Sequence, residues 1–376
     1  MSDKVLFSRI SAANGKKIGH ARLNKPQSLN ALDIDMVRAL MAMLLEWQQD
    51  PQIVAVFVDG AGEKAFCAGG DVVAMHSVMK KAPATVPLDV VTFFTEEYRL
   101  DYLIHTYAKP IIAWGSGVVM GGGLGLFAGA SHRIVTETSR VAMPEISIGL
   151  YPDVGGSWFL NQMPEGMGLF LGLTAASVNA ADMLTIKLAD YFVADAAKDD
   201  FLIGLASVNW DAIDSSQQQK CTALCHRFQK LYQSGLPAPI VTLQQDLIAA
   251  CTQDNDVELV VNNILNLPCQ EIKWLQKAQK TLAEGSKLTA AIVFEQLQRA
   301  KTMTLADCFR MELTLSCRCA QLGEFQEGVR ALLIDKDRNP KWQYPSIKDI
   351  TPELITQCFA PLWSPSSHPL CNLEKS

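Results

Sequence analysis

The chain has little of what would carry it to a membrane or to a nucleic acid. Among its 376 residues the 39 acidic side chains outnumber the 33 basic ones, which gives a formal net charge of -6. No basic surface is therefore expected to attract nucleic acid or anionic lipid. No stretch reaches the roughly 18 uninterrupted apolar residues of a membrane helix, because Ile111 to Ala130 is broken by glycines and by Ser116. We expect neither a membrane nor a nucleic-acid partner.

We also expect no targeting segment in these residues, and no zinc or disulfide pattern. Residues 1–10 have neither the apolar core of a signal peptide nor an Arg- and Ser-rich transit segment. The 10 cysteines are scattered, and the closest groups, Cys221 with Cys225 and Cys317 with Cys319, have no second ligand pair at zinc spacing. We predict reduced thiols packed as small apolar side chains, no metal, and a cytoplasmic protein or the processed form of an organellar one.

The hydrophobic pattern predicts an α/β part first and a helical part second. Apolar runs from Lys17 to Leu23 and from Ile53 to Asp59 read as strands on either side of a helix from Asp33 to Gln49. The pattern predicts further elements in a similar order: a helix at Pro87–Tyr107, a strand at Pro110–Trp114, a helix at Leu124–Ala130 and a strand at His132–Glu137.

Beyond about Gly166 the apolar spacing turns helical. Residues 200–330 show almost no strand pattern, only amphipathic helices such as Gln217 to Tyr232 and Val257 to Asn266. The sequence thus divides into a core at 1–200 that carries the active site, a helical region at 201–345 that closes the site or mediates assembly, and a tail at 346–376 lying on the surface.

Glycines concentrate in one run, Gly115 to Gly125, which follows a predicted strand and opens a predicted helix. Its backbone N–H groups would favour negative charge. The spacing fits neither a dinucleotide fingerprint nor a Walker loop, because Leu124-Gly-Leu126 stands where Lys and Ser or Thr would be needed. Taken alone, the run predicts an anion site no better than it predicts close backbone packing.

A second turn of small residues, within Lys64 to Asp71 (Lys-Ala-Phe-Cys-Ala-Gly-Gly-Asp), breaks this tie. Two strand-to-helix turns now present free N–H groups. Two such donors aimed at one point form an oxyanion hole, which stabilises charge developing on a carbonyl oxygen by ~3 to 4 kcal/mol per donor. A polarised thioester is a suitable substrate for such a site.

Together with Ala142-Met-Pro-Glu145, these two motifs resemble the signature of the crotonase (enoyl-CoA hydratase/isomerase) superfamily. The resemblance implies an α/β fold, a spiral of repeated β-β-α units followed by a C-terminal all-helical region. It places the two oxyanion donors on the backbone N–H groups of Gly70 and Gly122. It further implies contacts with coenzyme A at Ala31, Ala68 and Gly69.

The chain departs from the hydratases of this superfamily at one carboxylate. Hydratases carry two glutamates; here the position of the first is Gly125, while the second, Glu145, remains. Hydration needs paired carboxylates to deliver water and a proton, so this loss argues against it. The segments around Asp153 (Tyr151-Pro-Asp-Val-Gly-Gly-Ser157) and Phe93-Phe-Thr-Glu-Glu-Tyr98 instead resemble the 3-hydroxyisobutyryl-CoA hydrolases of the same superfamily.

Three acids are the candidates for catalysis and substrate binding. Glu145 would act as a nucleophile that forms a mixed anhydride or as a general base that activates water, and the sequence does not separate these roles. Asp153, the second catalytic candidate, would hydrogen-bond a substrate hydroxyl, although Pro-Asp before Gly-Gly is also ordinary turn chemistry. The resemblance gives Glu97 a substrate contact, as it does Gly122; the alternative for Glu97 is a solvated charge on a charge-rich helix.

The sequence thus predicts a thioester hydrolase that converts 3-hydroxyisobutyryl-CoA, or a similar small 3-hydroxyacyl-CoA, to the free acid and CoA. By resemblance this is a step of valine breakdown. Coenzyme A is part of the substrate, no cofactor is expected, and a homo-oligomer is left open. The alternatives are an enoyl-CoA hydratase or isomerase, disfavoured by Gly125, and a non-catalytic acyl-CoA- or RNA-binding relative, disfavoured by the retained Glu145 and Asp153 and by the acidic balance.

Overall fold

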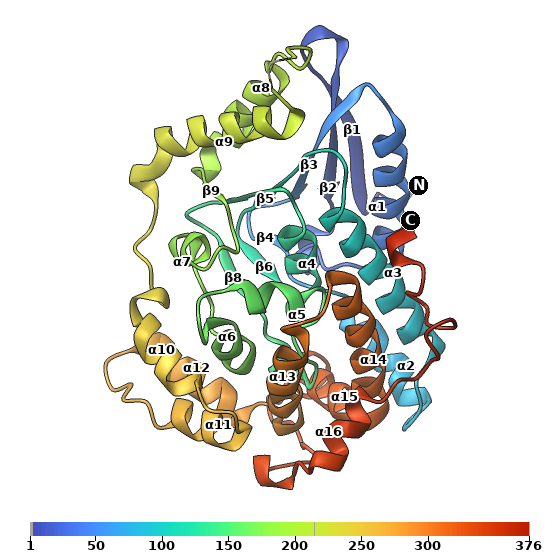
Figure 1. Ribbon diagram of the computed structural model, residues 1–376, viewed down its shortest axis with the longest axis vertical. Coiled ribbons are helices and arrows are strands. Elements are labelled where there is room, and N and C mark those ends of the chain that lie inside the picture. Colours follow the sequence, from blue (N-terminus) through green and yellow to red (C-terminus); the bar gives the residue numbers. More distant parts are fainter. Residues whose placement is uncertain (1–2, 214, 376) are drawn as a thin grey trace. The chain divides into compact units, whose positions relative to one another are not determined.

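The computed structural model describes residues 3–213 and 215–375, and Figure 1 shows the course of the chain. By its internal contacts the chain forms two compact units, each assembled from three segments. Unit 1 comprises Met1–Gly70, Leu103–Val141 and Val178–Ile240, and unit 2 comprises Asp71–Tyr102, Ala142–Ser177 and Val241–Ser376. The division predicted from the sequence, 1–200, 201–345 and 346–376, follows chain order and stays a prediction.

Unit 1 is built on a six-stranded sheet of order β1-β2-β3-β5-β7-β9. Its strands are β1 (Val5–Ser11), β2 (Lys17–Leu23), β3 (Ile53–Gly60), β5 (Ile111–Gly115), β7 (His132–Val135) and β9 (Tyr191–Phe192). β1 pairs antiparallel with β2, and the pairs that follow are parallel. The central strand β3 is buried from Ile53 to Asp59, as expected for an apolar run in a parallel sheet covered on both faces.

A second sheet has the order β4-β6-β8, with β4 at Ala65–Cys67, β6 at Val118–Met120 and β8 at Arg140–Ala142. Along the chain, strands of the two sheets alternate and a helix follows each pair, in the order β3-β4-α2, β5-β6-α4 and β7-β8-α5. These helices are α2 (Val72–Lys81), α4 (Gly122–Ala128) and α5 (Gly156–Phe159). The predicted repetition of β-β-α units is therefore present.

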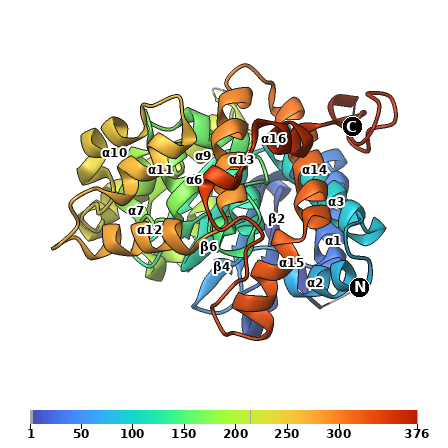
Figure 2. The same ribbon diagram turned by 90° about the horizontal axis from the view of Figure 1, so that it is seen from below.

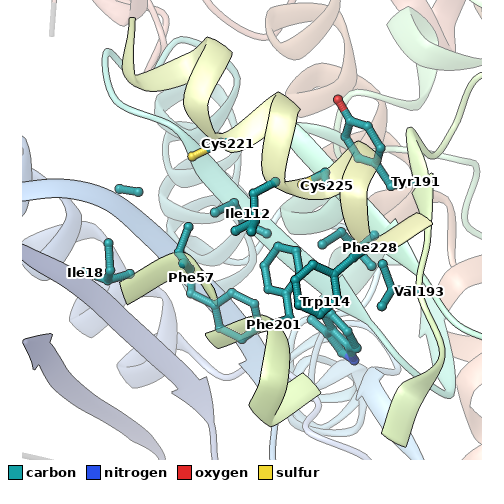
Figure 3. Close-up of a cluster of buried hydrophobic side chains, with 14 of the residues drawn as sticks. Ile18, Phe57, Ile112, Trp114, Tyr191, Val193, Phe201, Cys221, Cys225 and Phe228 are labelled. Atoms are coloured by element: carbon teal, nitrogen blue, oxygen red, sulfur yellow. The ribbon is translucent and has the colours of Figure 1, made fainter. Parts of the chain in front are cut away.

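The remaining helices of unit 1 are α1 (Ile34–Gln49), α7 (Ala180–Thr185), α8 (Lys198–Ala206) and α9 (Gln217–Tyr232). Side chains of α8 and α9 pack on the large sheet, where Phe201 lies 5.6 Å from Trp114 and 5.1 Å from Phe228 between ring centroids (Figure 3). Cys221 and Cys225 are fully buried in the same cluster, and burial raises the pKa of the Cys221 thiol to about 12. Both act as small apolar side chains, as predicted.

Unit 2 is helical. Besides α2 and α5 it contains α3 (Leu88–His105), whose last three residues belong to unit 1, and α6 (Met167–Thr174). The helices that follow in the sequence are α10 (Gln245–Thr252), α11 (Val257–Leu265), α12 (Lys273–Glu284), α13 (Lys287–Ala300), α14 (Leu305–Leu322), α15 (Glu324–Val329), the π-helix Arg330–Ile334 and α16 (Pro352–Phe359). Figures 1 and 2 show α10, α11 and α12 grouped beside α6. Residues 200–330, for which the sequence predicted almost no strand, form helices and loops wherever the structure describes them.

The C-terminal tail, predicted to lie on the surface, is anchored in unit 2. Helix α16 packs on α14, and the side chains of Cys358 and Leu370 are fully buried while Leu373 is 4% exposed. Apolar residues spaced along a polar, proline-containing segment thus hold it in place. Across residues 3–213 and 215–375, no helix combines the length and the apolar character that a membrane span requires.

Candidate active site

Helix α3 turns an acidic face into the interior of unit 2. Glu97 is 2% exposed and Asp101 is 0% exposed, whereas Arg99 between them is exposed. The two acids stand four residues apart, which places them on one face of the helix. The burial of Glu97 excludes the alternative that it is a solvated surface charge.

Glu145 and Asp153 lie close in sequence, and each is 4% exposed. Glu145 opens a short 3-10 helix, while Asp153 is followed by Val154 at φ 51° and Gly155 at φ 87°, both in the left-handed region. A β-branched residue rarely adopts a positive φ, so this turn holds backbone strain that surrounding contacts must balance.

Helices α13 and α14 supply those contacts. The fully buried carboxyl group of Glu312 accepts the backbone N–H of Gly155 and that of Ser157, each at 2.8 Å. Gln296 donates to the side-chain oxygen of Ser157 at 2.7 Å and to the carbonyl oxygen of Pro152 at 2.6 Å. Burial raises the pKa of Glu312 to about 8, although its hydrogen bonds to the turn oppose that shift. The turn is thus fixed from two helices of the 201–345 region, which was predicted to close the site or to mediate assembly.

We call Glu97, Asp101, Glu145 and Asp153 the acid cluster. Burial raises the pKa of the first three well above their ordinary values, and neighbouring carboxyl groups add to each shift. Burial raises the pKa of Asp153 to about 7, against a hydrogen bond from the Tyr98 hydroxyl at 2.6 Å. Burial thus shifts all four acids of the cluster toward their protonated forms. Perturbed acids gathered in this way mark a candidate functional site.

Several oxygens of the acid cluster have no hydrogen-bond partner among the residues that the structure describes. They are Oε1 of Glu97, both carboxyl oxygens of Asp101 and Oε2 of Glu145. A buried polar atom without a partner costs roughly 1 to 3 kcal/mol, and proteins keep such atoms where a ligand or an ordered water completes the bond. The cluster is therefore suited to a ligand that brings hydrogen-bond donors.

The two glycine turns lie together in unit 1. Gly69, after β4, has φ 115°, and Gly121, the N-cap of α4, has φ 48°. A side chain at Gly123 would collide with Cys67, and a Cβ atom on Gly69 would lie 3.9 Å from the amide nitrogen of Gly122. The turn after β4 and the start of α4 therefore lie against each other, which requires glycine at these positions.

The first turn of α4 leaves backbone donors outside the helix. Leu124 N is bonded to the carbonyl of Gly121 at 2.7 Å, so the N–H of Gly122 precedes the helix's own hydrogen bonds. Gly70 forms a parallel β-bridge with Leu32. The two predicted oxyanion donors thus belong to neighbouring turns of one unit, and their joint action as an oxyanion hole stays a prediction.

The segment predicted to bind coenzyme A packs on the first of these turns. Leu32 N donates to the carbonyl of Gly69 at 2.8 Å, and Ala68 N donates to the carbonyl of Leu29 at 3.0 Å, with Ala31 between the two bonded residues. A cavity of about 410 Å³ adjoins the segment and is lined by Pro26, Leu29, Asn30, Ala61, Gly62, Glu63, Lys64 and Ala65.

The predicted site residues fall into two groups, each within one unit. Unit 1 holds Ala31, Ala68, Gly69, Gly70 and Gly122, and unit 2 holds Glu97, Glu145 and Asp153. Sequence reasoning missed Tyr98, Asp101 and Glu312. Tyr98 closes a motif that was already identified, Asp101 follows Glu97 by one helical turn, and Glu312 is a lone acid on the apolar face of α14; each of these signals could have found them.

Residues 18–359 match the family model described as enoyl-CoA hydratase/isomerase. The mitochondrial 3-hydroxyisobutyryl-CoA hydrolase of Danio rerio is 34% identical over 362 residues, covering 96% of this chain and 90% of that protein. The protein of the same name from Xenopus laevis is 36% identical over 349 residues, covering 92% of this chain and 87% of that protein.

Two solved structures also match the chain over nearly its full length. An enoyl-CoA hydratase from Rhodobacter sphaeroides has a TM-score of 0.82 and 31% identity, covering 96% of this chain and 98% of that chain. A carnitinyl-CoA dehydratase from Mycobacterium thermoresistibile has a TM-score of 0.81 and 30% identity, covering 96% and 97%.

The chain therefore belongs to the enoyl-CoA hydratase/isomerase family and has its crotonase fold, with the helical C-terminal region that the sequence predicted. Within that family it is a relative of the 3-hydroxyisobutyryl-CoA hydrolases, as the motifs around Glu97 and Asp153 predicted.

Proposed function

We propose that this chain hydrolyses the thioester of 3-hydroxyisobutyryl-CoA, or of a similar small 3-hydroxyacyl-CoA, to the free acid and CoA. The acid cluster is the observation that carries the proposal, because three of its four buried acids present carboxyl oxygens without partners among the described residues. A 3-hydroxyl group would donate to such an oxygen, whereas an acyl group without it would leave the oxygen unpaired. The names of the Danio and Xenopus relatives support the same substrate.

In this reaction the N–H groups of Gly70 and Gly122 stabilise the oxyanion that forms on the thioester carbonyl. Glu145 attacks the carbonyl carbon or activates the water that does so, and either role uses its ionised form. The water oxygen ends in the acid, and CoA leaves as the thiol. Asp153 and Glu97 hold the hydroxyl end of the acyl group, and Ala31, Ala68 and Gly69 lie along coenzyme A.

Hydration of an enoyl-CoA is the second candidate, favoured by the name of the Rhodobacter sphaeroides structure. Against it stands Gly125, buried in α4 where the hydratases resembled by this sequence carry their first glutamate. The location of the protein, cytoplasmic or in an organelle, and its assembly as a homo-oligomer stay predictions; the names of the relatives place those proteins in mitochondria.

The deciding experiment compares free-thiol release from 3-hydroxyisobutyryl-CoA with hydration of crotonyl-CoA, for the unmodified chain, Glu145→Ala and Asp153→Ala. We expect rapid thiol release, no hydration, and loss of release in both variants. Hydration without thiol release would refute the hydrolase. Inactivity toward both substrates would favour another acyl group or a binding protein.

A further inference from the structure

Three buried hydroxyl groups connect Asp153 to the backbone of α14. The hydroxyl of Tyr98 lies 2.6 Å from Oδ2 of Asp153 and 2.7 Å from Oγ of Ser316. Oγ of Ser316 lies 2.9 Å from the hydroxyl of Tyr151, which donates to the carbonyl oxygen of Glu312. All three hydroxyl-bearing side chains are 0% exposed, and the proposed function gives none of them a role. We call Tyr98, Ser316 and Tyr151 the hydroxyl chain.

The protonation state of Asp153 decides whether every contact along the hydroxyl chain has a hydrogen. From Asp153 to the carbonyl of Glu312 there are four oxygen–oxygen contacts. Each hydroxyl carries one hydrogen and the carbonyl carries none. When Asp153 is ionised, only three hydrogens are available for the four contacts. One contact then consists of two oxygens with no hydrogen between them. When Asp153 carries a proton, four hydrogens fill the four contacts, all directed from Asp153 toward Glu312.

We propose that the hydroxyl chain holds Asp153 as a neutral carboxylic acid, which makes Tyr98, Ser316 and Tyr151 positioning residues of the active site. A single tyrosine hydroxyl would favour the carboxylate, because it donates to it. The serine and the second tyrosine reverse this preference, since the chain behind Tyr98 is complete only when Asp153 contributes a hydrogen. Burial acts in the same direction and raises the pKa of Asp153 to about 7.

Among the residues that the structure describes, the groups that face Asp153 electrostatically are acids or hydroxyl and thiol groups, and none of them is a cation. They are Glu97, Tyr98 and Asp101 of α3, Glu145 and Tyr151 before the turn, and Glu312 and Cys319 of α14. A neutral Asp153 removes its own charge from beside Glu145, and with it one of the contributions, after burial, that raise the pKa of Glu145. That consequence for catalysis rests on the proposed function, whereas the protonation of Asp153 does not.

The test is a carbon-13 NMR titration of the full chain labelled at the aspartate carboxyl carbon, with the Asp153 signal assigned by its loss in Asp153→Asn. We expect a midpoint of about 7 in the unmodified protein. Tyr151→Phe leaves two contacts and two hydrogens, directed from Ser316 to Tyr98 and from Tyr98 to an ionised Asp153. The midpoint should therefore fall by at least about half a pH unit.

Ser316→Ala also leaves two contacts with two hydrogens and should lower the midpoint in the same way. Tyr102→Phe is the matched control, because it also removes a tyrosine hydroxyl from α3. The Tyr102 ring packs on Phe309 and does not belong to the hydroxyl chain, so this variant should leave the midpoint unchanged. Circular dichroism and thermal melting identify the variants that keep the fold.

An unchanged or higher midpoint in either folded variant, Tyr151→Phe or Ser316→Ala, overturns the proposal. The two substitutions interrupt the hydroxyl chain at different residues. If one variant does not fold, the other still tests the proposal. Thiol release from 3-hydroxyisobutyryl-CoA by the unmodified protein is measured separately. Its absence would count against 3-hydroxyisobutyryl-CoA as the substrate and leave the titration result standing.

Discussion

Glu312 holds Gly155 through a 2.8 Å hydrogen bond from the glycine N–H to a carboxyl oxygen, although the two residues stand 157 positions apart in the sequence. Its second oxygen takes the N–H of Ser157. Between these contacts and Asp153 lies Val154, with its positive φ. A helix near the C-terminus thus fixes the backbone that carries a catalytic candidate.

We expect Glu312→Gln to destabilise the protein by roughly 1 to 3 kcal/mol, because the new amide group would face a buried backbone N–H and leave it without an acceptor. Unfolding in urea measures the loss. Glu295→Gln on α13 is the control: it breaks a partly exposed ion pair with Arg299 and should cost under about 0.5 kcal/mol. Equal losses in the two variants would contradict the role given to Glu312.

Asp101→Asn should stabilise the protein at neutral pH. Burial and then the charge of Glu97 raise the pKa of Asp101 well above its ordinary value, so the folded state keeps a proton that the unfolded chain releases. Stability is therefore lost as pH rises above the unfolded pKa of about 4, and asparagine has no proton to release. We expect a gain in the free energy of unfolding by urea at pH 7 that shrinks toward pH 4.

Asp307→Asn is the control for which we expect the opposite change in stability. Burial alone would raise the pKa of Asp307, but hydrogen bonds from Thr304 and Arg310 outweigh it and lower the pKa. This side chain is half exposed, so its replacement should cost under about 1 kcal/mol at pH 7. No stabilisation by Asp101→Asn would show that the buried acid carries no penalty, and equal stabilisation by both substitutions would show that the gain does not depend on burial.

Asp59 in unit 1 should stabilise the fold above pH 4. Burial alone would raise its pKa, but hydrogen bonds from His20 and Arg22 and the charge of Lys198 hold it at about 2. Its contribution is present above the unfolded pKa and is lost as pH falls from about 4 to 2. Asp59→Asn should cost about 1 to 3 kcal/mol at pH 7, a figure kept low because Arg22 and Lys198 reach solvent. A cost that persists unchanged at pH 3 in thermal melts would refute this linkage.

Glu97→Leu should reduce selectivity for the 3-hydroxyl group. We expect the ratio of kcat/KM for 3-hydroxyisobutyryl-CoA to that for isobutyryl-CoA to fall by about 10-fold or more, because a buried hydrogen-bonding carboxyl is removed. Glu96→Leu, at the half-buried neighbouring position, should leave the ratio within about twofold. An unchanged ratio in Glu97→Leu would remove Glu97 from substrate recognition.

The strands and helices with a strong apolar period could be read from the sequence, and others could not. β2 and α9 coincide with the predicted Lys17–Leu23 and Gln217–Tyr232, because each has a sustained apolar pattern. β4, β6 and β8 have three residues each, too few to show a period, so the second sheet was not located. It was the resemblance to a known family, rather than periodicity, that implied the repeated β-β-α units.

The candidate site, too, could be predicted from the sequence only in part. Glu97, Glu145 and Asp153 were found through local motifs, and all three are buried in unit 2. The contact between Tyr98 and Ser316 joins positions 218 residues apart, which no local pattern encodes. Charge on α3 was equally uninformative, because a solvated helix face and a buried acid cluster use the same residue types.

Gln296 and Glu312 hydrogen-bond the turn around Asp153, and both belong to the C-terminal helices. Helices that come after this turn in the chain set the backbone around one of its acids. A recombinant that took residues 241–376 from a relative with different chemistry would inherit the donor's buried partners for this turn. The turn that carries Asp153 and the helices that hold it would therefore have to be exchanged together for these hydrogen bonds to persist.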